Sequence, residues 1–247
     1  MTMPYSALQL AEAFIKTGEL ADALDALNSH LTQSPQDADA RRMRAAVCLR
    51  LGQFQQALDD LNQLNTPQDR LMCSTVYERM GELEQALNVL ADDAEDRLIE
   101  RRLYLLQQLG RVAAARVISD DQPRTWRWCQ WSGDLAVAAE DYPAAVMHYT
   151  QALNTLPPQS SQALQGIAAR LLLARGAAYL VMQRWDDAEA DYVAAEQIIP
   201  DDPIIVFNRG VIRYHRGERQ GGLAQCYQAI EAAPAAMRPA MQAALPE

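Results

Sequence analysis

The chain has 247 residues, of which 49% are hydrophobic and 22% charged, a composition typical of a folded protein rather than a disordered one. Its formal net charge of −10 argues against general nucleic-acid binding, because such binding mostly neutralises phosphates. No stretch approaches the roughly 18 consecutive apolar residues of a membrane-spanning helix, so we expect no membrane insertion.

The N-terminal residues predict two helical hairpins in succession. In residues 4–37, apolar and small residues recur at helical spacing, with a glycine between two such runs and a proline after the second. The positions that carry this pattern are Leu10, Ala11, Phe14, Gly18, Ala23, Leu27 and Pro35. Residues 38–66 repeat it with Ala45, Cys48, Gly52, Ala57 and Leu61. Gly18 and Gly52 define a period of 34, which the two hairpins share.

The period then shortens to 29, the interval from Gly52 to Gly81 and again from Gly81 to Gly110. Residues 67–95 fit a third hairpin through Ser74, Tyr77, Ala86 and Leu90. Residues 96–124 fit a fourth through Ile99, Leu103, Leu106 and Ala115. We expect short helices and altered curvature between about 62 and 125, while the register between 62 and 140 stays open.

The next two hairpins cover residues 126–158 and 161–202. The second helix of the first one is marked by Asp141, Tyr142, Ala145, Tyr149, Ala152 and Pro157. The corresponding residues of the following hairpin lie 43 positions on, and the nine extra residues fall in the stretch PPQSSQALQ. We therefore expect one long first helix over about 161–182, capped by Ser160 or Ser161.

The last hairpin, 203–236, repeats the one before it at a period of 34. The equivalent pairs are Gly176 and Gly210, Ala188 and Gly222, Tyr192 and Cys226, Ala195 and Ala229, and Pro200 and Pro234. The remaining residues, 237–247, are expected to form a tail or a short cap over the last hairpin, since repeat stacks need polar ends.

This pattern resembles the tetratricopeptide repeat, a helix-turn-helix unit of about 34 residues with small residues at positions 8, 20 and 27 and proline at 32. The resemblance implies an all-α fold: an α-solenoid, or right-handed superhelix, of about seven antiparallel hairpins. N-terminal repeats would cover 1–125 and C-terminal repeats 126–236, in one continuous solenoid. Departures from the pattern are Arg175 and Arg209 at position 7, Arg213 at position 11 and Gly222 at position 20.

Three of the four tryptophans lie in the stretch QPRTWRWCQWSGDL. A strict count back from Ala145 places Cys129, Ser132, Gly133 and Ala136 at positions 4, 7, 8 and 11. One extra residue in the turn would instead place Trp128, Trp131, Ser132 and Leu135 there. We favour this shifted register, because its spacing is that of a buried helix face. It makes Trp128 and Trp131 core residues and puts Trp126 on the partner-facing side.

We find no pattern that predicts catalysis, a cofactor or a metal. His30, His148 and His215 have no ligand partner at i+3 or i+4, and Cys48, Cys73 and Cys226 occupy core positions. The sequence has neither a phosphate loop nor a dinucleotide fingerprint. Scattered cysteines and no recognisable secretory signal favour the cytoplasm. We therefore expect a non-enzymatic protein.

The resemblance implies that the first helix of each hairpin lines a concave groove, with positions 2, 5, 9, 12 and 13 facing it. The candidates for partner binding are Arg42, Arg50, Arg97, Glu100, Tyr104, Trp126, Leu173, Ala177, Leu180, Phe207, Val211 and Tyr214. Such a groove, charged at one end and apolar at the other, suits a peptide or an amphipathic helix. The carboxylate clamp of some family members is not expected. Leu173 and Ala177 replace its Lys and Asn, and Asn208 is assigned a structural role.

The leading hypothesis is a non-catalytic interaction protein: a scaffold, an adaptor or a chaperone-like binder of a protein or peptide partner. Two alternatives stay open. The chain could assemble with a second copy through apolar residues such as Ile204, Ile205 and Phe207, or it could be the regulatory subunit of an enzyme complex.

Overall fold

The computed structural model describes residues 6–90, 94–158 and 161–246, and these residues form fifteen α-helices and no β-strand. The predicted all-α architecture of serial helical hairpins is therefore confirmed. Contacts between Cα atoms divide the chain into two units, Met1–Arg111 and Val112–Glu247. This division falls earlier than the expected boundary at 125/126, and the two halves of the expected hairpin 96–124 belong to different units.

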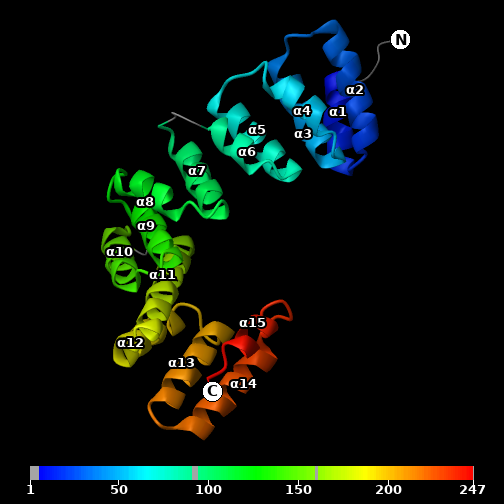
Figure 1. The fold of residues 1–247 in the computed structure, drawn as a ribbon. Helices are drawn as coiled ribbons and strands as arrows, with labels where there is room; N and C mark the ends of the chain where they lie inside the picture. Colours follow the sequence, from blue (N-terminus) through cyan, green and yellow to red (C-terminus); the bar gives the residue numbers. More distant parts are fainter. Residues whose placement is uncertain (1–5, 91–93, 159–160, 247) are drawn as a thin grey trace. The chain divides into compact units, whose positions relative to one another are not determined.

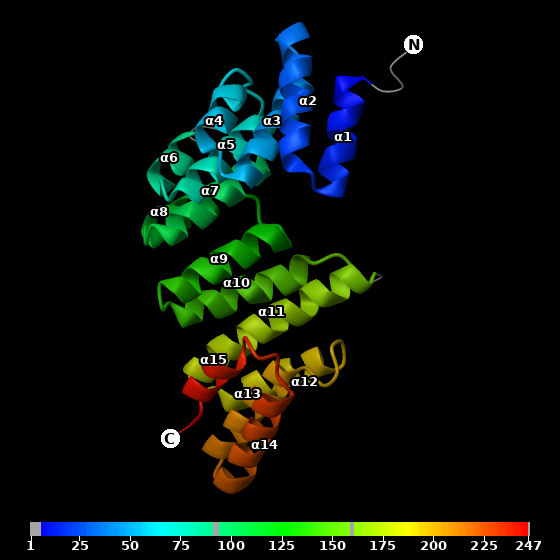
Figure 2. The same cartoon turned by 90° about the vertical axis from the view of Figure 1, so that its right-hand side faces the viewer.

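The first unit consists of three packed hairpins and a further helix (Figures 1 and 2). Its helices are α1 (Ala7–Thr17), α2 (Leu20–Gln33), α3 (Ala38–Leu51), α4 (Phe54–Leu61), α5 (Pro67–Met80), α6 (Leu83–Asn88) and α7 (Asp96–Gln108). The shortened period is accommodated by the second helices, since α4 has 8 residues and α6 has 6.

The second unit begins with α8 packed on α9 and continues with three hairpins. Its helices are α8 (Val112–Asp120), α9 (Trp126–Ala138), α10 (Tyr142–Thr155), α11 (Gln162–Val181), α12 (Trp185–Glu196), α13 (Pro203–His215), α14 (Arg219–Ala232) and α15 (Arg238–Ala243). Figure 2 shows α9, α10 and α11 side by side, as their contacts require.

Side chains begin several of the helices by accepting hydrogen bonds from free backbone N–H groups. Ser6 and Gln9 form a reciprocal capping box at α1, and Thr66 and Asp69 form another at α5. At α11 the backbone N–H of Leu164 donates to Ser161 Oγ at 3.3 Å. The alternative cap, Ser160, lies outside the described residues. These contacts fix where the first helices start.

Close approach of the two helices in each hairpin of the second unit depends on a glycine in the first helix. A Cβ added at Gly133 would lie 2.5 Å from Tyr149 Cε1, and one at Gly176 would lie 3.0 Å from Tyr192 Cζ. The aromatic ring follows its glycine at the same interval in both hairpins. Gly133 and Gly176 therefore occupy the same repeat position, position 8.

This equivalence shows that the strict register of the α9 hairpin holds and that the shifted one is wrong. Glu140 and Gln183 each lie seven residues after their close-packed glycine, and each has a left-handed φ of 58°. The two turns therefore have the same length, without an extra residue. The spacing of the tryptophans favours the shifted register in the sequence. In the structure, however, Gly133 occupies the position of α9 that contacts α10.

Two arginines at repeat position 7 form ion pairs between the two helices of their own hairpin, whereas Arg209 pairs with Glu189 and Glu196 of the preceding hairpin. Arg175 in α11 binds Asp191 in α12, with Nη2–Oδ1 at 2.6 Å and Nε–Oδ2 at 2.8 Å. Arg44 in α3 binds Asp60 in α4 in the same way, at 2.6 and 2.7 Å. The third nitrogen of each guanidinium reaches the preceding hairpin, at the oxygen of Thr150 or Asn28. The departure from leucine at position 7 is therefore compensated by an aspartate on the second helix, at the same interval in both hairpins.

The helix α11 is long and apolar enough, by length and composition alone, to cross a membrane. In the structure it packs against α10 and α12, and its buried residues include Ala168, Leu171 and Ala178. Near the middle of this helix, Arg175 forms an ion pair with Asp191 of α12. Packing inside the second unit buries 28% of the apolar window of this helix.

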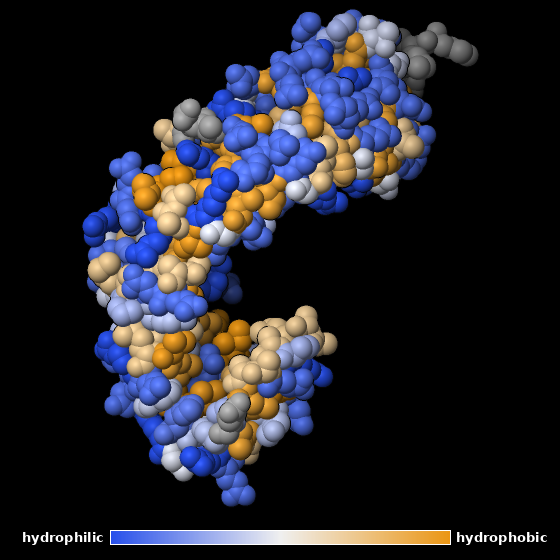
Figure 3. Space-filling model, viewed as in Figure 1, coloured by the Kyte–Doolittle hydropathy of each residue, from blue (hydrophilic) through white to orange (hydrophobic). Residues whose placement is uncertain are grey.

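The last described residues cover the end of the second unit. Met241 of α15 is 7% exposed and packs in one cluster with Phe207, Cys226 and Ile230. Arg238 donates to the backbone oxygens of Ala233 and Glu231, at 2.8 and 3.0 Å. In Figure 3 the surface over α15 is pale to orange, whereas that over α1 and α2 is mainly hydrophilic.

Candidate partner-binding surface

The candidate residues of the first unit lie on its first helices, and they differ in how far they are already engaged. Arg50 on α3 and Arg97 on α7 are exposed. Arg42 is half-buried and holds Asp69 at two points, with Nε–Oδ1 at 2.7 Å and Nη2–Oδ2 at 3.2 Å. Arg42 therefore ties α3 to the start of α5, and its charge is largely neutralised inside the unit.

Two further candidates, Glu100 and Tyr104, are on α7, and Tyr104 belongs to a small charged cluster with α5. Arg101 donates to Glu78 at 2.5 Å and lies 5.3 Å from the Tyr104 ring centre. A hydrogen bond to Glu78 raises the pKa of the Tyr104 phenol. Burial raises the pKa of Glu78, but Arg101 and Tyr104 together hold that pKa below its usual value. The cluster leaves little free charge on Glu78.

Three exposed cations occupy the same place on successive first helices of this unit. Lys16, Arg50 and Arg79 each precede by two residues a left-handed glycine that ends the helix. All three are at repeat position 13, and we call them the basic row. No ion pair involves any of them within residues 6–90 and 94–111. Position 13 is one of the positions that sequence reasoning assigns to the groove, so Lys16 and Arg79 were expected there together with Arg50.

The candidate residues on α11 are only partly accessible. Leu173 and Leu180 are half-buried and pack against a cluster that includes Ile205 and Ile212 of α13. Ala177, between them, is exposed. The next helix in the stack therefore covers much of the apolar surface expected there.

The prediction that Phe207 and Tyr214 line an accessible groove is wrong, because both are buried, at 5% and 8% exposure. Phe207 lies beneath Met241 of α15, and Val211 is half-buried against the same cluster. Tyr214 has the Arg219 guanidinium 5.6 Å from its ring centre. Met241 of the C-terminal cap thus belongs to the cluster that buries Phe207, whereas Tyr214 lies outside that cluster.

Asn208, for which no carboxylate clamp is expected, is half-buried on α13. Burial raises the pKa of the nearby core tyrosine, Tyr192. The structural role of Asn208 stays a prediction.

The tryptophans of α9 do not form one exposed patch. Trp128 is buried, at 4% exposure, as predicted, whereas Trp131 is half-buried. Trp126 is also half-buried and packs against a cluster formed by α9, α10 and α11, including Tyr149 and Leu171. It therefore contributes mainly to packing within the second unit.

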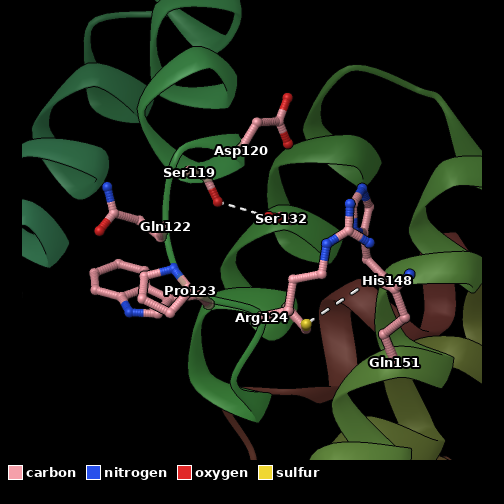
Figure 4. A pocket seen from close by; sticks show the side chains of 10 residues that line it. Ser119, Asp120, Gln122, Pro123, Arg124, Ser132, His148 and Gln151 are labelled. Carbon is pink, nitrogen blue, oxygen red and sulfur yellow. Dashed lines mark hydrogen bonds between the residues drawn. The ribbon is translucent and has the colours of Figure 1, made fainter.

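A small pocket lies between the α8–α9 loop and α10 (Figure 4). Ser119 and Ser132 share a buried hydrogen bond of 2.6 Å, and Arg124 extends toward His148. Burial lowers the pKa of His148. The cavity measures about 40 Å³, which is room for about one or two waters. It is too small for a peptide side chain or a cofactor.

The four cysteines are free and buried. Burial raises the pKa of Cys48, Cys73 and Cys226 to about 11, so these thiols stay protonated at neutral pH. Among the described residues, no group of three or more His, Cys, Asp and Glu side chains is arranged to hold a metal ion.

Comparison with protein families gives a match to the tetratricopeptide repeat at residues 8–69 and 173–236, just over half of the chain. No curated protein sequence matches the chain. A tetratricopeptide repeat protein from Parabacteroides merdae is similar in structure, with 16% identity, coverage of 96% of this chain and 94% of that one, and a TM-score of 0.60.

Two further solved structures are similar. The C-terminal part of a repeat protein from Cytophaga hutchinsonii is 12% identical, over 91% of this chain and 95% of that one, with a TM-score of 0.59. PilF of Pseudomonas aeruginosa is 17% identical, over 78% and 90%, with a TM-score of 0.51. At these identities the likeness establishes the fold.

Proposed function

The chain belongs to the tetratricopeptide repeat family, and on that premise we propose that it is a non-catalytic protein-interaction module. It holds a peptide or helix of a partner protein against the first helices of its N-terminal unit. The observation that carries this proposal is the exposure of charged side chains on these helices, above all Lys16, Arg50, Arg79 and Arg97.

The state of the other candidate residues supports the same assignment. Arg42 is committed to Asp69, and Phe207 and Tyr214 are buried by their own unit. The exposed charged side chains of α1, α3, α5 and α7 therefore remain available to a partner, and on α11 Ala177 is exposed as well. The protonated, buried thiols support a binding role rather than nucleophilic catalysis.

Site-specific photo-cross-linking tests the proposal. A photoreactive phenylalanine analogue replaces Arg50 on α3 in one variant and Gln55, an exposed residue on the second helix α4, in a control. Both variants are expressed in native cells and irradiated. We expect a cross-linked partner protein at position 50 and none at position 55.

Three outcomes contradict the proposal. Equal capture at both positions means that the first helices are not the binding face. Capture at neither position, with both variants folded, means that this face has no protein partner. A product of only twice the chain's mass at position 50 favours self-assembly instead.

A further inference from the structure

We propose that the partner segment held by the N-terminal unit is an extended acidic peptide, with carboxylates at about every third residue and apolar side chains between them. This inference rests on the proposed function and names the chemistry of its partner. It starts from the basic row, Lys16, Arg50 and Arg79.

The basic row is positively charged, whereas the chain as a whole has a net negative charge. The protein has 32 acidic and 22 basic residues, so a set of exposed equivalent positions chosen at random would tend to be acidic. Instead three of the four equivalent positions carry a cation, and the fourth, Gln108 on α7, is neutral. A cation in the last turn also complements the helix dipole, but that interaction leaves the charged group exposed to solvent.

Neighbouring carboxylates on this face are mostly neutralised within the unit. Asp39 pairs with Arg42 at 2.9 Å, and Glu78 pairs with Arg101. Glu12, on the same helix as Lys16, stays exposed, and Glu100 is half-buried. The basic row therefore keeps unpaired positive charge toward its Arg50–Arg79 end, where an acidic ligand would bind.

Apolar surface lies directly beside this charge. Leu51 and Met80 are 38% and 36% exposed, and they are the exposed large hydrophobic residues of the described part of the first unit. Each immediately follows an arginine of the basic row, Arg50 or Arg79. The same two helix ends thus offer a cation for a carboxylate and an apolar side chain for an apolar contact.

The spacing of the first helices sets the spacing of the ligand's charges. A helix with its side chains is about 10–12 Å wide, which sets the least spacing of successive first helices, and an extended chain advances about 3.3 Å per residue. A carboxylate at about every third residue therefore matches successive cations of the basic row. Apolar residues between the carboxylates then reach Leu51 and Met80.

Fluorescence anisotropy with defined peptides tests this inference on the full chain. The probes are fluorescein-labelled peptides of four Glu-Leu-Ser triplets, four Gln-Leu-Ser triplets and four Lys-Leu-Ser triplets. We expect saturable binding of the Glu peptide that weakens with added salt, and binding of the Gln peptide that is at least about tenfold weaker. The Lys peptide is not expected to bind.

Charge reversal locates the site. The variant R50E/R79E is expected to weaken binding of the Glu peptide by at least about tenfold. A matched control, R124E/R219E, changes the net charge equally at exposed arginines of the second unit and is expected to change affinity by less than about twofold. Circular dichroism melting confirms that each variant is folded, and R50Q/R79Q gives the same test without new charges.

Equal affinity for the Glu and Gln peptides, absence of saturable Glu-peptide binding, or an unchanged affinity of R50E/R79E each overturns the inference. These outcomes are separable from failure of the proposed function. If the partner still cross-links at position 50 and not at position 55, the first helices bind a partner, but the partner is not acidic.

Discussion

Arg175 and Asp191 join the two helices of their hairpin in the same geometry that Arg44 and Asp60 use in the other unit. Asp191 and Asp60 are both nearly buried, with side-chain exposures of 6% and 2%. An aspartate in such a place is favourable only while the guanidinium stays bound. The pair therefore substitutes for the apolar contact that leucine makes at repeat position 7.

The variant D191A is expected to lower the free energy of unfolding by about 3–5 kcal/mol, because it leaves a partly buried arginine without its carboxylate. The double variant R175L/D191L restores an apolar contact and should recover most of that loss. Urea unfolding followed by circular dichroism measures both. The exposed pair Arg184–Asp187 serves as the control, and D187A should cost about 0–1 kcal/mol. Equal costs of D191A and D187A would mean that burial of the pair is unimportant.

Two glycines in the second unit are expected to respond oppositely to alanine. A Cβ at Gly222 would lie 2.6 Å from Gly210 O and 2.6 Å from Tyr214 N, which are backbone atoms that cannot move aside. G222A should therefore separate α13 from α14 and lower the melting temperature. Gly166, in α11, has nothing within 4 Å of such a Cβ, so G166A should stabilise the helix by about 0.5–1 kcal/mol. Thermal melts of the two variants measure both effects. If G222A raises the melting temperature, α13 and α14 are not closely packed at Gly222.

Truncation of Trp128 tests the core of the α9 hairpin. W128A is expected to lower the free energy of unfolding by about 3–5 kcal/mol, as large core truncations do. W126A should cost less, since that side chain is only half-buried. Denaturant titration gives both values. If W128A stays folded and lowers the free energy of unfolding by less than about 1 kcal/mol, Trp128 is not part of the core.

Asp69 makes the first unit sensitive to acid. Burial raises its pKa, but hydrogen bonds from Arg42 and Thr66 hold the pKa below its usual value of 3.8. Because the folded pKa is lowered, the ionised carboxylate stabilises the fold above 3.8, and this contribution is lost as the pH falls through the folded pKa. D69N should lower stability at neutral pH and flatten the decline below about pH 4. Melting temperatures over that range, compared with the parent protein, test this; an unaltered profile would exclude the contribution of Asp69.

The hairpins of this fold are visible in the sequence because their determinants are local. Regularly spaced glycines end the first helices of the first unit, and Tyr149 and Tyr192 follow their glycines at one fixed distance. Arg175, at position 7, looked like a departure from the family pattern. Its partner Asp191 follows it at the same interval at which Asp60 follows Arg44, and that spacing could have been recognised.

Other features depend on contacts that no local pattern reports. The turn before α10 has Glu140 in a left-handed conformation. A glycine at this position would have marked the end of α9 in the sequence, and without that mark the register of α9 is predicted wrongly. Phe207 is buried in a cluster that includes Met241 of α15, a helix of six residues that is too short to show periodicity. The exposure of Arg50, in contrast to the engagement of Arg42, depends on Asp69 in the next hairpin.

Hydrogen–deuterium exchange with the cross-linked partner is the most direct test of the binding face. Adding that partner should slow exchange of backbone amides in the last turns of α1, α3 and α5, around Lys16, Arg50 and Arg79, and leave α2, α4 and α6 unchanged. Protection confined to the second helices, or no change in the first unit, would contradict the proposal that its first helices hold the partner.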